Sequence, residues 1–144
     1  MLDEYLTFLK REEGLRLAPY LDQVGKPTIG YGHLLDSMDH PPLTEVEAEA
    51  LLRADATKAE TAALHLAPNL LHFPKRLAAL TDLCYNVGAH AVAGSGTVAA
   101  FLREDWKDAA TRFVKWDKGG RPLKAIPALT LRRQRLVPWI LDGP

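Results

Sequence analysis

The segment from Thr44 to about residue 66 constrains the fold most strongly, because its pattern is that of one long helix. Thr44 and Glu47 have the spacing of a capping box, in which two side chains cap each other's backbone N–H groups at a helix start. The helix can then continue through EVEAEALLRADATKAETAALHL. At ~1.5 Å per residue it would span roughly 30 Å, which is long enough to link two lobes. We therefore predict a connecting helix over residues 44–66.

The chain begins with a shorter amphipathic pattern. Four apolar side chains recur at helical spacing, at Leu2, Tyr5, Leu6 and Leu9. They predict a helix over residues 2–12, and Gly14 lies where such a helix would stop. We expect this helix to pack on the C-terminal part of the chain.

Two alternating apolar stretches follow, at residues 15–21 and 28–33, on either side of the turn-forming residues QVGKP. They predict a β-hairpin or a small sheet. Residues 36–43, with two adjacent prolines, predict a loop. Together these segments predict an N-terminal lobe over about 12–43.

Downstream of the long helix, the pattern is helical throughout. We predict helices at about 75–88, 97–103 and 105–115, then a loop at DKGGRP. A terminal helix follows in LTLRRQRLVPWIL, which Pro138 should kink or shorten. The prediction is a single domain over 1–144 in the α+β class, mainly helical. It has an all-helical C-terminal lobe over about 67–144 and a cleft between the two lobes.

Charge and cysteine content exclude several functions. Eighteen Lys and Arg balance eighteen Asp and Glu, which argues against a dedicated nucleic-acid binder. Arg132, Arg133 and Arg135 form a local cluster, for which a solvated helix face is the default interpretation. The single cysteine, Cys84, lies in an apolar run and predicts a buried thiol rather than a disulfide framework or a zinc site.

Membrane and export signals are also missing from the pattern. No apolar stretch approaches the about 18 residues of a membrane span, so we expect no stable membrane insertion. The first residues carry acids where a signal peptide has basic residues. We therefore expect the chain to be made in a cytoplasm.

The stretch EEGLRLAPYLDQVGKPTIGYGH, residues 12–33, holds the chemistry. Two carboxyl groups, Glu13 and Asp22, suit hydrolysis of a glycosidic bond, in which one acts as a protonated acid and the other is ionised. Glu13, beside apolar residues, is the better candidate for the acid. Solvated surface acids fit the same spacing, so both interpretations stay open at this point.

If residues 28–33 form one strand, their alternate positions have different roles. In a single strand, alternate side chains point to opposite faces, so Thr28, Gly30 and Gly32 would share one face. That face carries a hydroxyl and two residues without side chains, which leaves room for a bulky ligand. Ile29, Tyr31 and His33 would face the core.

The order Glu-Gly-Leu-Arg-Leu, Tyr-x-Asp and Thr-Ile-Gly-Tyr-Gly-His over residues 13–33 resembles the signature of the phage-type lysozymes, glycoside hydrolase family 24. The resemblance implies a lysozyme-like fold and an inverting peptidoglycan muramidase that cleaves the β-1,4 bond between N-acetylmuramic acid and N-acetylglucosamine. It implies a triad of Glu13 as general acid with Asp22 and Thr28 positioning the attacking water. It implies no metal and no organic cofactor.

The resemblance extends more weakly along the rest of the chain. It implies that His33 and Asp55 form a structural pair. Together with the strand parity, it suggests that the glycan is contacted by Gly30, Gly32, Leu34, Tyr85, Asn86, Thr97 and Arg112. Ordinary packing or surface positions remain an alternative for the last five. The family's paired arginines are followed by a Glu that this chain lacks after Arg133, which leaves the C-terminal packing open.

An alternative function is a catalytically weak lysozyme-fold module that binds glycan or serves as a scaffold. Such a module would lose part of the triad, whereas this chain keeps all three residues, which favours the enzyme. The expected partner is the glycan strand of bacterial peptidoglycan, and the simplest oligomeric state is a monomer. The resemblance implies an endolysin, made in the host cytoplasm, that reaches the periplasmic wall through a holin-type lesion.

Overall fold

The computed structural model describes residues 1–143 of the 144-residue chain. Within these residues there are seven α-helices, one 3-10 helix and two small antiparallel sheets. The predicted class, α+β and mainly helical, is confirmed. The chain divides into two compact units, essentially residues 3–58 and the residues from 59 onward. The division falls within the long helix, and the first unit includes the N-terminal helix.

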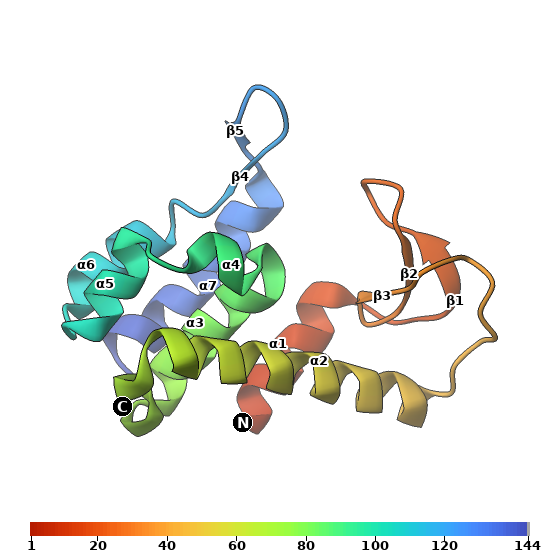
Figure 1. The fold of residues 1–144 in the computed structure, drawn as a ribbon, viewed down its shortest axis with the longest axis horizontal. Coiled ribbons are helices and arrows are strands. Elements are labelled where there is room, and N and C mark those ends of the chain that lie inside the picture. Colours follow the sequence, from red (N-terminus) through yellow and green to blue (C-terminus); the bar gives the residue numbers. More distant parts are fainter. Residues whose placement is uncertain (144) are drawn as a thin grey trace. The chain divides into compact units, whose positions relative to one another are not determined.

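The first unit begins with α1 (Asp3–Glu13) and continues into a three-stranded sheet (Figure 1). The strands are β1 (Arg16–Leu21), β2 (Pro27–Gly30) and β3 (His33–Leu34), and they lie in that order in the sheet. Helix α1 buries three of the four predicted side chains, Tyr5, Leu6 and Leu9, whereas Leu2 precedes the helix and is half-buried. Gly14, at φ +67°, follows its last residue and donates its N–H to the Lys10 carbonyl at 3.0 Å. The helix therefore stops where its sequence predicts.

The two-face alternation that we predicted across residues 28–33 is wrong. Strand β2 ends at Gly30, and the chain turns through Tyr31 and Gly32 before returning as β3. Gly30 and Gly32 have φ values of +66° and +76°, which an extended strand does not contain. Thr28 and Ile29 are 2% and 0% exposed, so the strand is covered at both positions and Thr28 does not lie on an open face.

Helix α2 (Glu45–Leu66) begins at the capping box that the sequence predicts. The Thr44 N–H donates to Glu47 Oε1 at 3.0 Å, and the Glu47 N–H donates to Thr44 Oγ1 at 3.1 Å. These bonds satisfy two backbone donors that a helix start leaves without intrahelical partners. The long helix is confirmed over almost the predicted range.

The second unit is helical apart from one short hairpin. Its elements are η1 (Pro68–His72), α3 (Pro74–Val87), α4 (Ala89–Val92), α5 (Gly96–Leu102), α6 (Trp106–Phe113) and α7 (Pro127–Leu141). Helix α7 packs on both α3 and α6, and α5 packs on α6. The sequence did not predict η1 or α4, and α7 continues through Pro138 to Leu141. The predicted DKGGRP loop contains β4 (Lys118–Gly119) and leads into β5 (Lys124–Ala125). The two strands form a short hairpin, drawn in blue in Figure 1.

The solvated helix face that we predicted for the arginine cluster is wrong at two of its three positions. Arg132 and Arg133 are 5% and 0% exposed, and both approach Asp82 of α3, which is also fully buried. Arg132 donates to the two Asp82 oxygens at 3.0 and 2.8 Å, and Arg133 Nη1 lies 3.7 Å from Asp82 Oδ2. A carboxylate from another helix thus neutralises part of the buried positive charge.

Cys84 is a buried free thiol, as its apolar surroundings predict. Burial raises the pKa of the thiol to about 11. Because the thiolate is the reactive form of cysteine, Cys84 stays protonated and unreactive at neutral pH.

Candidate active site

Glu13 is the last residue of α1, and its carboxylate lies against the turn between β2 and β3. A Cβ atom placed on Gly32 would lie 2.7 Å from Glu13 Oε2 and 3.4 Å from Glu13 Cδ. Real Cβ atoms do not approach another atom that closely. Glycine at position 32 therefore leaves the space that the Glu13 carboxylate occupies.

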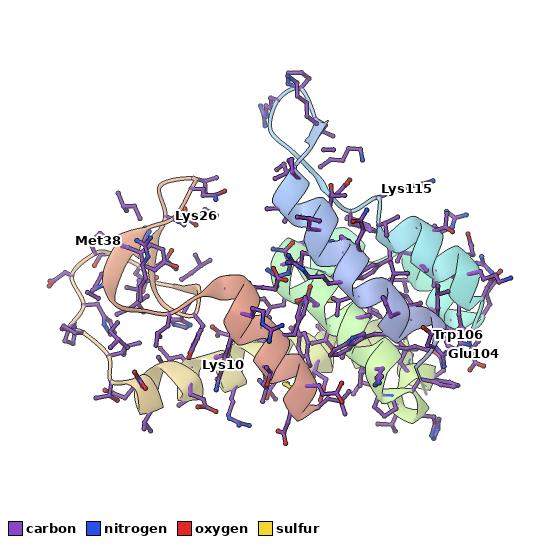
Figure 2. All side chains as sticks on the ribbon, turned by 180° about the vertical axis from the view of Figure 1, so that it is seen from behind. Lys10, Lys26, Met38, Glu104, Trp106 and Lys115 are labelled. Carbon is purple, nitrogen blue, oxygen red and sulfur yellow. The ribbon has the colours of Figure 1, made fainter. Side chains whose placement is uncertain are left out.

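Asp22 follows β1 and organises the turn that leads into β2. Its Oδ1 accepts hydrogen bonds from the backbone N–H groups of Val24 and Lys26, at 2.9 and 2.8 Å. Figure 2 labels Lys26 at this turn and Met38 in the loop that follows β3. Within residues 1–143, no hydrogen bond is made to Asp22 Oδ2. One carboxylate oxygen is thus held by the turn, and the other is available to a ligand.

Thr28 is connected to Asp22 through the backbone of Lys26. Its Oγ1 donates to the Lys26 carbonyl at 2.9 Å, while the N–H of the same residue donates to Asp22 Oδ1. The Thr28 proton is used in this bond, so the hydroxyl oxygen can only accept a further hydrogen bond. The side chains of Asp22 and Thr28 therefore share one anchor, although their backbones lie on different sides of the turn.

Tyr20 lies among these groups and was not a site residue in the sequence analysis. It pairs with Thr28 across the sheet, and the Arg16 guanidinium lies 4.6 Å from the centre of its ring. Burial raises the pKa of the Tyr20 hydroxyl; the Arg16 charge opposes that rise, and the negative charges of Glu13 and Asp22 add to it. One phenol thus experiences both carboxylates, which places Glu13 and Asp22 in the same electrostatic environment. The Tyr-x-Asp motif was the signal that could have identified it.

His33 and Asp55 are in contact, although 22 residues separate them. His33 Nδ1 lies 2.7 Å from Asp55 Oδ2, and each side chain is about one-third exposed. The contact joins β3 to α2 within the first unit. It places the structural pair that the family resemblance implies at the end of the sheet.

Gly30 and Leu34 have contrasting positions. Gly30 is buried, and a Cβ atom there would lie 3.4 Å from Leu43 Cδ1 and 3.6 Å from Ala48 Cβ. Its small size serves packing against the start of α2. Leu34 pairs with Thr28 in the sheet, and 57% of its surface is exposed.

The four distal residues all belong to the second unit. Tyr85 and Asn86 lie in the last turn of α3, Thr97 lies in α5, and Arg112 lies in α6. Thr97 is 3% exposed and accepts a hydrogen bond from Trp116 Nε1 at 3.0 Å, whereas Asn86 is exposed. Arg112 donates to Asp108 at 3.0 Å, and its guanidinium covers Gly96 beside Thr97. The predicted cleft between the lobes stays a prediction.

The described residues contain no group of three or more His, Cys, Asp or Glu side chains that could hold a metal ion. No helix in residues 1–143 has both the length and the apolar character that crossing a membrane requires.

The sequence of residues 10–135 matches the family model described as phage lysozyme. The chain belongs to the phage lysozyme family. This lysozyme is 33% identical, over 131 residues, to an endolysin of Acyrthosiphon pisum secondary endosymbiont phage 1, covering 90% of this chain and 89% of that protein. It is 34% identical, over 135 residues, to an endolysin of Salmonella phage P22, again covering 90% and 89%.

A solved structure shows the same fold. The endolysin from Escherichia coli O157:H7 phage FAHEc1 superposes with a TM-score of 0.83 at 26% identity, covering 98% of this lysozyme and 92% of that chain. The lysozyme-like fold is therefore confirmed. The lysozyme is a glycoside hydrolase that lyses peptidoglycan by a muramidase-type activity.

Proposed function

We propose that this lysozyme is an inverting muramidase that cleaves the β-1,4 bond between N-acetylmuramic acid and N-acetylglucosamine. Glu13 is its general acid, and Asp22 and Thr28 position the attacking water. The supporting observation is that all three groups meet the same small sheet: the Glu13 carboxylate fills the space beside Gly32, and Asp22 and Thr28 both bond to the backbone of Lys26. The reaction needs two carboxyl groups at one site. The spacing of the family signature in residues 13–33 supports the same assignment.

Glu13 ends α1, and its carboxyl group lies against the turn between β2 and β3. The space left by Gly32 sets where that carboxyl group lies. In the reaction its proton passes to the glycosidic oxygen as the bond from that oxygen to the anomeric carbon breaks.

Asp22 and Thr28 act on the other reactant, which is the attacking water molecule. Asp22 Oδ1 is held by two backbone N–H groups, so Oδ2 is left to accept a hydrogen bond from the water. The Thr28 hydroxyl donates its hydrogen bond to the Lys26 carbonyl, so its Oγ1 can accept the second hydrogen bond from the water. The water oxygen forms the new bond to the anomeric carbon, and the ionised Asp22 stabilises the positive charge that develops there and takes the proton that the water releases.

Substitution of Glu13 tests the proposal. Glu13→Gln keeps the size of the side chain and removes the acidic proton, so the lysis rate should fall at least about a hundredfold with the fold intact. A turbidity assay on purified peptidoglycan measures this. Glu12→Gln is the matched control and should lyse at the wild-type rate. Lysis by Glu13→Gln at a rate near that of the wild type would contradict the assignment of Glu13 as general acid.

We also propose that the lysozyme acts as a monomer and reaches the periplasmic wall through a holin-type lesion, as the family resemblance implies. Expression in a bacterial host should leave cells intact until a holin is co-expressed. Lysis without the holin would contradict this route.

A further inference from the structure

The hairpin of β4 and β5 carries positive charge that no nearby acid offsets at its tip. From residue 109 to residue 141, Asp117 is the only acidic residue in the sequence. It is buried at the base of the hairpin, where its Oδ1 accepts a hydrogen bond from Lys118 Nζ at 2.7 Å. Arg121 and Lys124 lie nearer the tip, are exposed and make no ion pair within residues 1–143. The tip therefore presents two uncompensated cations to solvent.

The base of the hairpin is fixed to the rest of the second unit. The Ile126 N–H donates to the Asp117 carbonyl at 2.7 Å, and Thr130 Oγ1 of α7 donates to Asp117 Oδ2 at 2.6 Å. The Ile126 side chain covers Gly119, where an added Cβ would lie 2.5 Å from Ile126 Cδ1. Every residue from 120 to 125 is exposed, and Figure 1 shows the hairpin extending past the N-terminal end of α7. The tip thus projects from an anchored base.

A large apolar side chain lies between the two cations. Leu123 is 73% exposed, next to Pro122 and flanked by Arg121 and Lys124. A single exposed leucine is ordinary on a protein surface, but this one shares a projecting tip with two cations. An anionic polymer would bind the cations and leave Leu123 in water. A bilayer with anionic phospholipid binds both kinds of group, because its phosphates attract Arg and Lys and its interface accepts an apolar side chain.

We propose that the tip of this hairpin docks reversibly on the surface of a bilayer that contains anionic phospholipid. Arg121 and Lys124 meet the headgroup phosphates, and Leu123 enters the interface between headgroups and acyl chains. Each basic residue near such a surface raises the affinity about fivefold. The zero net charge of the chain does not oppose this, since the positive charge is concentrated on one projecting element. The contact uses no residue of the proposed active site.

Sedimentation with lipid vesicles tests the charge contribution. The wild type should bind vesicles of phosphatidylglycerol and phosphatidylcholine in equal parts, and should dissociate as salt is raised, because salt screens the cations. The double variant Arg121→Gln/Lys124→Gln should bind roughly thirtyfold more weakly. Lys58→Gln/Lys107→Gln removes the same charge from exposed positions outside the hairpin and should bind like the wild type. Both double variants should lyse purified peptidoglycan, which contains no lipid, at the wild-type rate.

Leu123 distinguishes a lipid surface from an anionic polymer. Leu123→Ser keeps both cations and should weaken vesicle binding at least about tenfold. An environment-sensitive dye attached to Leu123→Cys should shift its fluorescence to the blue when the vesicles are added, whereas the same dye on Lys107→Cys should not. The buried Cys84 does not compete for the label.

Several outcomes would overturn the inference. They are absence of vesicle binding by the wild type, unchanged affinity of Arg121→Gln/Lys124→Gln, and an unshifted dye at position 123. Poly(glycerol phosphate) has the same anionic group without acyl chains. If it bound the wild type as tightly as the vesicles do, and Leu123→Ser left vesicle binding unchanged, the hairpin would be a site for anionic polymers. The proposed function is judged separately, by the loss of lysis in Glu13→Gln.

Discussion

At the scale of single residues, Gly30 and Gly32 show how one residue type serves two purposes within three positions. Both adopt positive φ, and both lie in the motif that predicts the active site. The missing side chain of Gly30 leaves space for Leu43 and Ala48, whereas that of Gly32 leaves space for the Glu13 carboxylate. The glycines that we predicted to make room for a sugar thus already have neighbours within the protein. At Gly32 that neighbour is the proposed general acid.

Gly32→Ala should therefore reduce catalysis more than stability. The added Cβ would displace the Glu13 carboxylate, and we expect the lysis rate to fall at least about tenfold. The positive φ adds a cost of roughly 1 kcal/mol. Gly94→Ala is the control, because Gly94 has a φ of +72° and nothing within 4 Å of its added Cβ. Turbidity assays and thermal unfolding compare the two variants, and equal lysis rates would contradict the role of Gly32.

At the scale of elements, interactions in the N-terminal half of α2 fix where the helix begins and how it contacts the sheet. The capping box fixes its first turn, and Asp55, about three turns further, holds His33 of β3. A shift in the start of α2 would rotate Asp55 away from the sheet. The capping box thus contributes to the placement of the strand that follows the Gly32 turn.

Thr44→Ala should destabilise the lysozyme by about 1 kcal/mol, because it removes the side-chain acceptor at the helix start. The effect should depend on pH. Hydrogen bonds from Thr44 lower the pKa of Glu47 below its ordinary value of 4.5. The stability from this ionised carboxylate is present above pH 4.5 and is lost as the pH falls through the lowered pKa.

Urea unfolding at pH 7 and at pH 3 measures this difference. The gap between the wild type and Thr44→Ala should narrow at the lower pH. Val46 lies on the same turn and is 80% exposed, so Val46→Ala should have an unfolding free energy close to that of the wild type at both pH values. The Thr44 backbone N–H donates to Glu47 in both proteins, so a gap that does not change with pH would exclude only a contribution of the Thr44 side chain to the ionised form of Glu47.

At the scale of the whole molecule, the lysozyme has zero net charge but concentrates buried charge in its second unit. Asp82 lies between Arg132 and Arg133, and the three residues join α3 to α7. Removing one member of a buried charge cluster leaves its partners uncompensated in a medium that solvates them poorly. The stability of this unit therefore depends on a carboxylate as well as on apolar packing.

Asp82→Asn should cost roughly 3–5 kcal/mol of unfolding free energy, since two buried guanidinium groups lose a carboxylate that both contact. Asp36→Asn, on an exposed loop, should change stability by less than about 0.5 kcal/mol. Chemical unfolding of both variants gives the comparison. Equal midpoints for Asp82→Asn and the wild type would show that the cluster is not needed.

The sequence by itself determined the features whose partners lie within a few residues along the chain. Such short spacings can be read directly from the sequence. They define the start of α2, the end of α1 before Gly14 and the family signature of residues 13–33. Only the tertiary structure decided which polar groups are buried and what each small residue makes room for. Arg132 meets Asp82 across 50 positions, and Gly32, between β2 and β3, meets Glu13 at the end of α1. The free energy of burying a charge depends on such distant partners, and helical periodicity carries no information about them.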